Sequence, residues 1–312
     1  MKVYSLLSLG EKHKENFSFK VLVHGENRNL SHATMNRPGL ALTGNFQIFS
    51  NNRIQLFGKG ETAFLYQEQH NPGLLVNCKK LMQEPVPCWI FTHGLFPPKA
   101  IIDLADEMKC PVFSSNLSTS LFAIRSNQIL TDEFAPRGVV HGVLVDIFGV
   151  GILLTGKSGI GKSETALELI QRGHRLVADD AIEIKSIKGG NILLGAGIRK
   201  EVAHFMEIRG LGIINIPHLF GTGAVRESKV IQLIVYLEEW TDTTTFDRLG
   251  IERHYKQLLD VTVPFRKIPV RIGRNIAIIV EVAAMNARLD NMGYNATRDL
   301  DDTMKRYMEK NK

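Results

Sequence analysis

The chain has 312 residues, a length that suits two domains of ordinary size. Hydrophobic residues make up 44% of it and charged residues 22%, as in soluble globular proteins, and no stretch approaches the roughly 18 apolar residues of a membrane helix. The formal net charge of +6 is spread along the chain, without a basic tail or block, which argues against nucleic-acid binding.

The three cysteines, Cys78, Cys88 and Cys110, are far apart and form no C-x-x-C pair. An odd number without close pairing indicates free thiols in a reducing compartment. The apolar stretch after Met1 is too short for a signal peptide. We therefore expect a cytoplasmic protein without a membrane segment.

Residues 1–130 are predicted to form an α/β domain. Residues 88–92 have the pattern of a buried strand, Pro97 and Pro98 open a helix through Ala105, and residues 111–113 follow as another strand. Strand, helix and strand within about 30 residues form a βαβ unit, which implies a partly parallel sheet. Gly58-Lys59-Gly60 lacks the rest of any phosphate-loop pattern and is interpreted as a turn. This domain shows no catalytic constellation, and its role stays unassigned.

The polar, proline- and glycine-containing stretch 126–138 suggests a domain boundary, and we place a second domain at residues 131–312. Five further elements are expected in it: strands at 139–148, 151–155, 174–178 and 230–237, and a C-terminal helix over about 299–308. The C-terminal helix has its acids early and its bases late, as the helix dipole favours.

A glycine loop follows the strand at 151–155 and matches the pattern G-x-x-x-x-G-K-[ST] throughout. Its residues are Gly156, Lys157, Ser158, Gly159, Ile160, Gly161, Lys162 and Ser163. Such a loop wraps an anion with its backbone N–H groups, and the helix that follows adds its positive end. Lys162 can reach the β- and γ-phosphates of a nucleotide, and the Ser163 hydroxyl can hold Mg²⁺. An apolar strand before the loop and an apolar-periodic helix after it favour a phosphate site over a chance glycine turn.

Phosphoryl transfer to a hydroxyl also needs a carboxylate that accepts a proton and a group that anchors Mg²⁺. Two strands end in paired acids, Asp179-Asp180 and Glu238-Glu239. The strand before Asp179 follows the loop helix directly, so a short crossover is expected to place it beside the loop strand. For Glu238 and Glu239, a solvated strand end is the simpler interpretation.

Four segments of the second domain are distinctive: His141-Gly142-Val143-Leu144-Val145-Asp146, the loop GKSGIGKSE, RLVADD, and above all residues 206–215. Through these segments, the domain closely resembles the HPr kinase/phosphorylase family of Gram-positive bacteria. The resemblance covers this domain nearly end to end. The first domain fits the family in length and position, without a sharp motif.

The resemblance implies a bifunctional enzyme. It phosphorylates a serine of the phosphocarrier protein HPr with ATP, and it removes that phosphate from phosphoserine-HPr by attack of inorganic phosphate, releasing pyrophosphate. By the same resemblance, this activity is expected to control carbon catabolite repression and sugar uptake. The resemblance also implies a C-terminal P-loop kinase domain similar to phosphoenolpyruvate carboxykinase, a Mg²⁺ cofactor, a homohexamer, and fructose 1,6-bisphosphate as an effector that favours kinase activity.

The family's functional positions fall on matching residues of this chain. The resemblance assigns active-site roles to His141, Lys162, Asp180 and Arg248, and magnesium binding to Ser163 and Glu207. We expect Asp179 to orient Asp180 or the metal. The resemblance assigns both directions of the reaction to Met206, Glu207, Ile208, Arg209, Gly210, Leu211, Gly212, Ile213, Ile214 and Asn215. It assigns dephosphorylation to Pro269, Val270, Arg271, Ile272, Gly273 and Arg274. If residues 270–274 are extended, Arg271 and Arg274 lie on opposite faces. Which of Asp179 and Asp180 transfers the proton is not decided by the sequence.

Two other functions are compatible with a phosphate loop of this kind. A small-metabolite kinase related to phosphoenolpyruvate carboxykinase would turn over without a protein acceptor. A nucleotide-regulated binding protein would bind nucleotide and transfer nothing.

Overall fold

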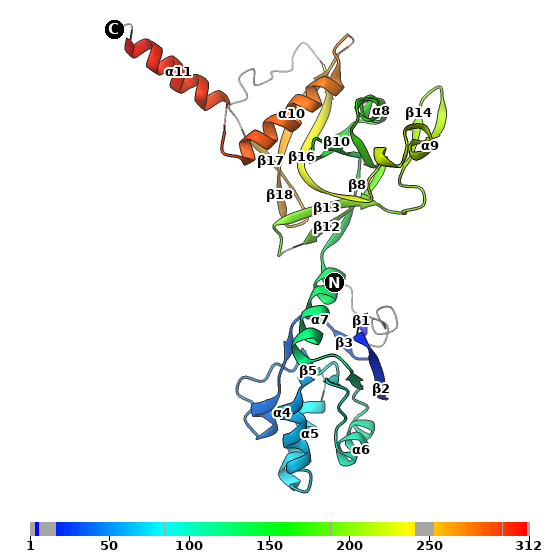
Figure 1. Cartoon of the computed structure of the whole chain (residues 1–312), viewed down its shortest axis with the longest axis vertical. Helices are drawn as coiled ribbons and strands as arrows, with labels where there is room; N and C mark the ends of the chain where they lie inside the picture. Colours follow the sequence, from blue (N-terminus) through cyan, green and yellow to red (C-terminus); the bar gives the residue numbers. More distant parts are fainter. Residues whose placement is uncertain are drawn as a thin grey trace. The chain divides into compact units, whose positions relative to one another are not determined.

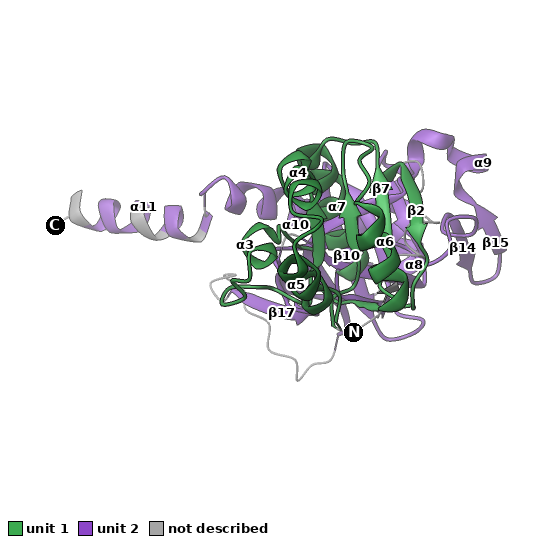
Figure 2. Cartoon of the chain, turned by 90° about the horizontal axis from the view of Figure 1, so that it is seen from below, with its two compact units in different colours: residues 1–134 green, residues 135–312 purple. Residues whose placement is uncertain are grey.

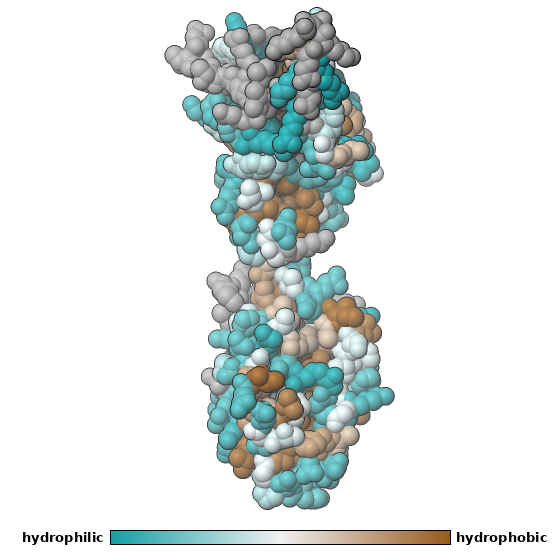
Figure 3. Space-filling model, turned by 90° about the vertical axis from the view of Figure 1, so that its left-hand side faces the viewer, coloured by the Kyte–Doolittle hydropathy of each residue, from teal (hydrophilic) through white to brown (hydrophobic). Residues whose placement is uncertain are grey.

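The computed structural model describes residues 4–5, 17–83, 85–187, 189–240, 253–271, 273–294 and 296–310. The chain divides into two compact units, residues 1–134 and 135–312, coloured green and purple in Figure 2. Within the described ranges, no helix combines the length and apolar character needed to cross a membrane. On the face shown in Figure 3, hydrophobic residues are interspersed with hydrophilic ones over both units.

Among its described residues, the first unit contains a five-stranded sheet in the order β2-β7-β6-β5-β4. Its parallel strands are β4 (Met35–Asn36), β5 (Ile54–Phe57), β6 (Trp89–Phe91) and β7 (Val112–Ser115), and β2 (Phe19–Val23) joins β7 antiparallel. The helices are α3 (Gly39–Leu42), α4 (Lys59–Gln67), α5 (Pro72–Met82), α6 (Lys99–Glu107) and α7 (Thr119–Phe134), and β1 (Tyr4–Ser5) pairs with β3 (Asn29–Leu30). The predicted α/β domain with a partly parallel sheet is confirmed (Figure 1).

The core of this unit contains clusters of aromatic rings among aliphatic side chains. On one side of the sheet, the rings of Phe57 and Phe91 stack at 4.6 Å, and Trp89 packs against Phe57 at 4.4 Å. The cysteines Cys78, Cys88 and Cys110 are buried and free, as predicted. Burial raises the pKa of the Cys78 and Cys110 thiols to about 12, so these thiols are unreactive.

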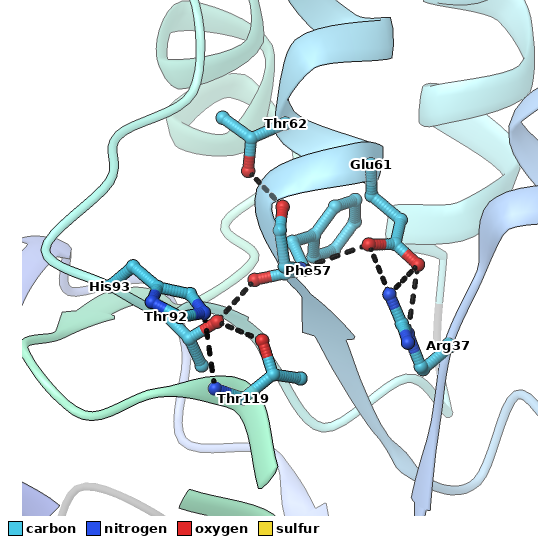
Figure 4. A network of polar contacts seen from close by, with 8 residues as sticks. Arg37, Phe57, Glu61, Thr62, Thr92, His93 and Thr119 are labelled. Carbon is cyan, nitrogen blue, oxygen red and sulfur yellow. Dashed lines mark hydrogen bonds and ion pairs between the residues drawn. The ribbon is translucent and has the colours of Figure 1, made fainter.

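Gly58 is the N-cap residue of α4, where a turn was expected. Figure 4 shows the polar contacts at this end of the sheet: Glu61 binds Arg37, the Thr92 hydroxyl lies 3.0 Å from the Phe57 carbonyl oxygen and 2.7 Å from the Thr119 hydroxyl, and the Thr119 N–H donates to His93. These contacts join the strand ends to the first turns of α4 and α7. Because α7 continues to Phe134, part of the stretch expected to be a linker is helical.

The second unit contains a nine-stranded sheet in the described part of the chain. Its main path is β11-β9-β10-β16-β13-β12-β8, with β18 beside β16 and β17 beside β18. The strands are β8 (Arg137–His141), β9 (Val143–Ile147), β10 (Val150–Gly156), β11 (Arg175–Ala178), β12 (Ala181–Ile187), β13 (Ile192–Gly197), β16 (Ser228–Glu239), β17 (His254–Leu258) and β18 (Val261–Val270). A separate hairpin consists of β14 (Phe205–Ile208) and β15 (Gly212–Asn215). The helices are α8 (Lys162–Gln171), α9 (Ile216–Phe220), the 3-10 helix η1 (Thr222–Ala224), α10 (Ile276–Asn291) and α11 (Ala296–Lys310).

Three parallel strands set the position of the site. β10, β16 and β18 run in one direction, with Gly156 opposite Leu237 and Leu237 opposite Ile268, so their carboxyl ends lie at one edge. Side chains of α8 and α10 pack on one face of these strands, in a core that includes Ala166, Leu169, Val235, Leu237 and Val280. Side chains of β12 and β13 pack on the other face with Leu144, Leu153 and Ile234.

Two sequence predictions about this sheet are wrong. Residues 139–148 form two strands, β8 and β9, separated at Gly142, whose close approach to the Leu154 carbonyl leaves no room for a Cβ atom. The strand before Asp179, β11, does not lie beside the loop strand. It pairs with β9, because the β9–β10 hairpin places β9 on that side of β10, and the parallel neighbour of β10 is β16.

Candidate active site

The phosphate loop connects β10 to α8. Gly159 and Gly161 have φ values of 79° and 96°, in the region that favours glycine, and α8 begins at Lys162. The Lys162 ammonium donates to the carbonyl oxygens of Gly156 (3.3 Å) and Lys157 (3.0 Å). The lysine is therefore folded over the first residues of the loop, where it can reach phosphate oxygens.

Asp179 lies against the start of α8. The Ser163 hydroxyl donates to the Asp179 carboxylate at 3.1 Å, and the backbone N–H groups of Asp180 and Glu207 also stabilise that carboxylate. Burial has a larger effect than these hydrogen bonds, which lower the pKa, and it raises the pKa of Asp179 to about 6. A hydroxyl and a carboxylate in contact beside a phosphate loop offer two oxygen ligands of the kind that Mg²⁺ prefers.

The raised pKa of Asp179 has a consequence for stability. The pKa of this carboxyl group is 3.8 in its ordinary state and about 6 in the folded protein. The folded state therefore loses stability as the pH rises from 3.8 to about 6, and the loss stays constant at higher pH. Asp179→Asn removes this loss. In the metal-free protein, we expect the variant to unfold at a higher temperature than the wild type at pH 8, with the difference shrinking towards pH 5. Thermal unfolding at pH 5, 6, 7 and 8 measures it, and a difference independent of pH would contradict the assignment.

Asp180 and His141 lie next to each other. Asp180 has a left-handed backbone, with φ 67°, and its carbonyl accepts from the Gly142 N–H at 3.0 Å. The His141 Nδ1 atom is 3.8 Å from an Asp180 carboxylate oxygen, and the two side chains are 82% and 90% exposed. Two groups that can exchange a proton therefore face solvent beside the phosphate loop, where an acceptor can reach them.

The β14–β15 hairpin contains residues 206–215 and contacts the phosphate loop. Glu207 lies opposite Ile213, while Met206 and Ile208 are buried in the core that includes the α8 side chains. The Arg209 guanidinium lies against Gly159, so that a Cβ atom there would be 2.8 Å from it. The structure thus brings the hairpin, the loop and Asp179 together.

Residues 269–274 begin at the sheet edge formed by the carboxyl ends of β10, β16 and β18. Pro269 and Val270 lie opposite Glu238 and Glu239 of β16. The expected extended conformation for residues 270–274 is wrong, because β18 ends at Val270 and the chain turns at Gly273, with φ 84°. The Arg271 guanidinium lies 5.8 Å from the centre of the Trp240 ring, and Arg274 donates to the Pro269 carbonyl at 3.4 Å. Arg248 and Ile272 lie outside the described residues.

A partly buried ion-pair cluster, which the sequence did not reveal, connects α8 to α10. Glu281 of α10 accepts from Arg172 at 2.6 Å, just after α8, and lies 2.8 Å from the ring of buried His174. The contact with Arg172 is the main cause of the lowered pKa of Glu281. Since residues 269–274 lead directly into α10, Glu281 links that segment to the helix of the phosphate loop. In the sequence, Glu281 shows only as one charge in an apolar run.

A glycine loop between a strand and a helix, a lysine over the loop, and a carboxylate on the loop serine together define a P-loop phosphotransferase. Two family models match the chain: "HPr Serine kinase N terminus" over residues 8–130 and "HPr Serine kinase C-terminal domain" over residues 132–304. The chain belongs to the HPr serine kinase family.

Curated relatives cover nearly all of the chain. The HPr kinase/phosphorylase of Treponema pallidum is 46% identical over 98% of this chain and 96% of its own length. Those of Leptospira biflexa and Lacticaseibacillus casei are 46% and 45% identical, over 92% and 89% of this chain and 90% and 86% of theirs. The solved Hpr(Ser) kinase/phosphatase from Coxiella burnetii is 34% identical, with a TM-score of 0.47 over 52% of this chain and 98% of that one.

Proposed function

We propose that this protein phosphorylates a serine of HPr with ATP and removes the phosphate by phosphorolysis, releasing pyrophosphate. The observation that carries the proposal is the contact of Ser163 with Asp179 beside the exposed pair of Asp180 and His141. It provides, at one loop, the oxygen ligands for a metal and a group that exchanges a proton. The names of the curated relatives support HPr as the acceptor. We also propose that the enzyme is cytoplasmic and controls carbon catabolite repression and sugar uptake.

Each residue has a proposed role. The loop, residues 156–163, binds the phosphates through its backbone N–H groups, and Lys162 binds the β- and γ-phosphate oxygens. Ser163 and Asp179 would hold Mg²⁺, with Glu207 as a further ligand from the hairpin. When bound, Mg²⁺ neutralises charge on the phosphate oxygens. Mg²⁺ usually takes only one or two carboxylates from a protein and keeps several waters.

One carboxylate serves both directions. Asp180 accepts the proton of the serine hydroxyl as the serine oxygen attacks the γ-phosphorus of ATP. In the reverse direction, inorganic phosphate occupies the loop and attacks the phosphoserine phosphorus, and Asp180 returns a proton to the departing serine oxygen. The 3.8 Å contact with His141 supports a role for the histidine in holding or relaying that proton. Arg248 is proposed to stabilise the charge of the transferred phosphoryl group.

We expect residues 269–274 to matter more for phosphorolysis. The reverse reaction must orient free phosphate against a phosphoserine without binding energy from adenosine. Arg271→Ala and Arg274→Ala should each reduce phosphorolysis by at least about tenfold more than phosphorylation, or roughly 1.4 kcal/mol of selective transition-state stabilisation. Initial rates with saturating HPr and phospho-HPr measure the two losses. Arg253→Ala, which removes an exposed ion pair with Asp290, is the matched control. Equal losses in both directions would indicate a role in folding or docking only.

The assembly is proposed to be a homohexamer. Sedimentation velocity at micromolar protein concentration should show a hexameric species, and a monomer at every concentration would contradict the proposal.

Fructose 1,6-bisphosphate is proposed to favour the kinase direction, and inorganic phosphate the reverse. Because phosphate and ATP share the loop, inhibition of the kinase by phosphate should weaken as ATP rises. Inhibition that stays constant with ATP would exclude shared occupancy.

Incubation with γ-labelled ATP and purified HPr tests the function. Label on a serine of HPr, dependent on Mg²⁺, supports the proposal. Label transferred to a small metabolite without protein acceptor would indicate a metabolite kinase, and nucleotide binding without transfer would indicate a nucleotide-regulated binding protein.

A further inference from the structure

Two adjoining cavities lie on the sheet face that carries Leu153 and Ile234, and Thr155, the residue before the phosphate loop, lines one of them. One, of about 320 Å³, is lined by Tyr236, Glu238, Tyr255, Lys256, Phe265 and Lys267. The other, of about 230 Å³, includes His141 and Thr155 in its lining. They share Tyr236 and Lys256 and so form one groove, which we call the β16 groove, from His141 on β8 to Lys267 on β18.

The strand register places the groove at the loop. Thr155, Tyr236 and Lys267 lie opposite one another on β10, β16 and β18, and Gly156, the first loop residue, follows Thr155 directly. The Lys162 ammonium rests on the carbonyls of Gly156 and Lys157. Since this lysine reaches the β- and γ-phosphates in such loops, the γ-phosphoryl end of the nucleotide belongs at the start of the loop. The β16 groove therefore ends next to the residue at which the phosphate loop begins.

The lining is suited to a polypeptide segment. Tyr236 and Phe265 lie with ring centres 6.4 Å apart, and Tyr255 is 54% exposed on the neighbouring strand β17. Aromatic side chains, such as the exposed Tyr255 and the half-buried Tyr236 and Phe265, are enriched in surfaces that bind protein partners.

The Glu238 carboxylate in the lining can accept a hydrogen bond from a bound segment. One carboxylate oxygen lies 3.6 Å from the Lys267 ammonium, and the other, Oε2, is buried and has no hydrogen-bond partner among the described residues. A buried acceptor without a donor is costly, so a bound segment that supplies an N–H or O–H group gains a hydrogen bond and removes that cost.

We propose that the β16 groove receives the serine-bearing segment of the acceptor protein. An apolar side chain of that segment packs on Tyr255 and Phe265, a donor group binds Glu238 Oε2, and the serine lies towards His141 and Asp180. Glu238 and Tyr255 then determine affinity for the acceptor and leave nucleotide binding unchanged. This inference rests on the proposed function, because it requires a protein acceptor.

The test compares Glu238→Gln and Tyr255→Ala with two matched controls, Glu239→Gln on the same strand and Tyr66→Ala, an exposed tyrosine of the first unit. For each variant, kcat and the KM values for HPr and for ATP are measured, with thermal unfolding to verify folding. We expect the KM for HPr to rise about tenfold in both groove variants, with kcat at saturating HPr and the KM for ATP within about twofold of wild type. The controls should match the wild type.

Three possible results of this experiment lead to different conclusions. An unchanged KM for HPr in both folded groove variants overturns the inference while the proposed function stands. A raised KM for ATP with an unchanged KM for HPr also overturns it and assigns the groove to the nucleoside. A wild-type protein that transfers nothing to HPr contradicts the proposed function, and with it the acceptor assigned to the groove.

Discussion

Lys162→Ala should abolish phosphorylation and phosphorolysis together. The ammonium lies over the first two loop residues, 3.3 and 3.0 Å from their carbonyl oxygens, where it can bind the phosphates of ATP or free phosphate. Removing one preorganised charge that stabilises a transition state typically costs about 10²–10³ in rate, or roughly 2.7–4 kcal/mol. If, as we propose, the same loop holds the phosphates in both directions, losses of at least this size are expected in each.

The control for Lys162→Ala is Lys59→Ala, in the Gly58-Lys59-Gly60 stretch of the first unit. Lys59 begins helix α4, far from the phosphate loop in sequence, and its loss should leave both rates near those of the wild type. Both rates are measured on protein whose thermal unfolding matches the wild type. A folded Lys162→Ala protein with near-normal kinase activity would remove the lysine from the role proposed here.

Asp180→Asn should reduce both activities by about 10²–10⁴, the usual contribution of a positioned proton acceptor. Asparagine keeps the shape of the side chain but cannot accept the serine proton or return it. The exposed carboxylate, 3.8 Å from His141, is free to approach an incoming hydroxyl, whereas Asp179 is engaged by Ser163. Nucleotide affinity should be close to that of the wild type, because the Asp180 side chain is 90% exposed and lies beside His141.

Asp179→Asn is the matched comparison for Asp180→Asn. It should raise the Mg²⁺ concentration needed for half-maximal rate, and part of the lost rate should return at high Mg²⁺. For Asp180→Asn, no Mg²⁺ concentration should restore the rate. The reverse pattern would make Asp179, with its pKa of about 6, the proton acceptor.

The local part of the site could be predicted from the sequence. A continuous motif defines the phosphate loop, and residues 156–163 join β10 to α8 as expected. The βαβ unit of residues 88–113 is likewise contained in a short stretch, with β6, α6 and β7 in the predicted order. Such features depend on neighbouring residues and are visible in one pass along the chain.

The order of the strands could not be predicted in the same way. The sequence placed the strand before Asp179 beside the loop strand, because a short crossover is the simplest connection after a helix. The β9–β10 hairpin occupies that position, so β16 became the parallel neighbour of β10, and the end of β16 with Glu238 lies next to the loop. The cavity beside Glu238 and the cluster of Arg172, His174 and Glu281 depend on contacts over long sequence separations, which a single sequence does not show.

Formation of pyrophosphate tests the central claim most directly. Phosphoserine-HPr is incubated with the enzyme, Mg²⁺ and ³²P-labelled inorganic phosphate, without ATP, and the products are separated. If one loop serves both directions, labelled pyrophosphate should form in equal amount to dephosphorylated HPr, and Lys162→Ala should form neither. Release of unlabelled inorganic phosphate from HPr without pyrophosphate would show hydrolysis by water and would contradict the account.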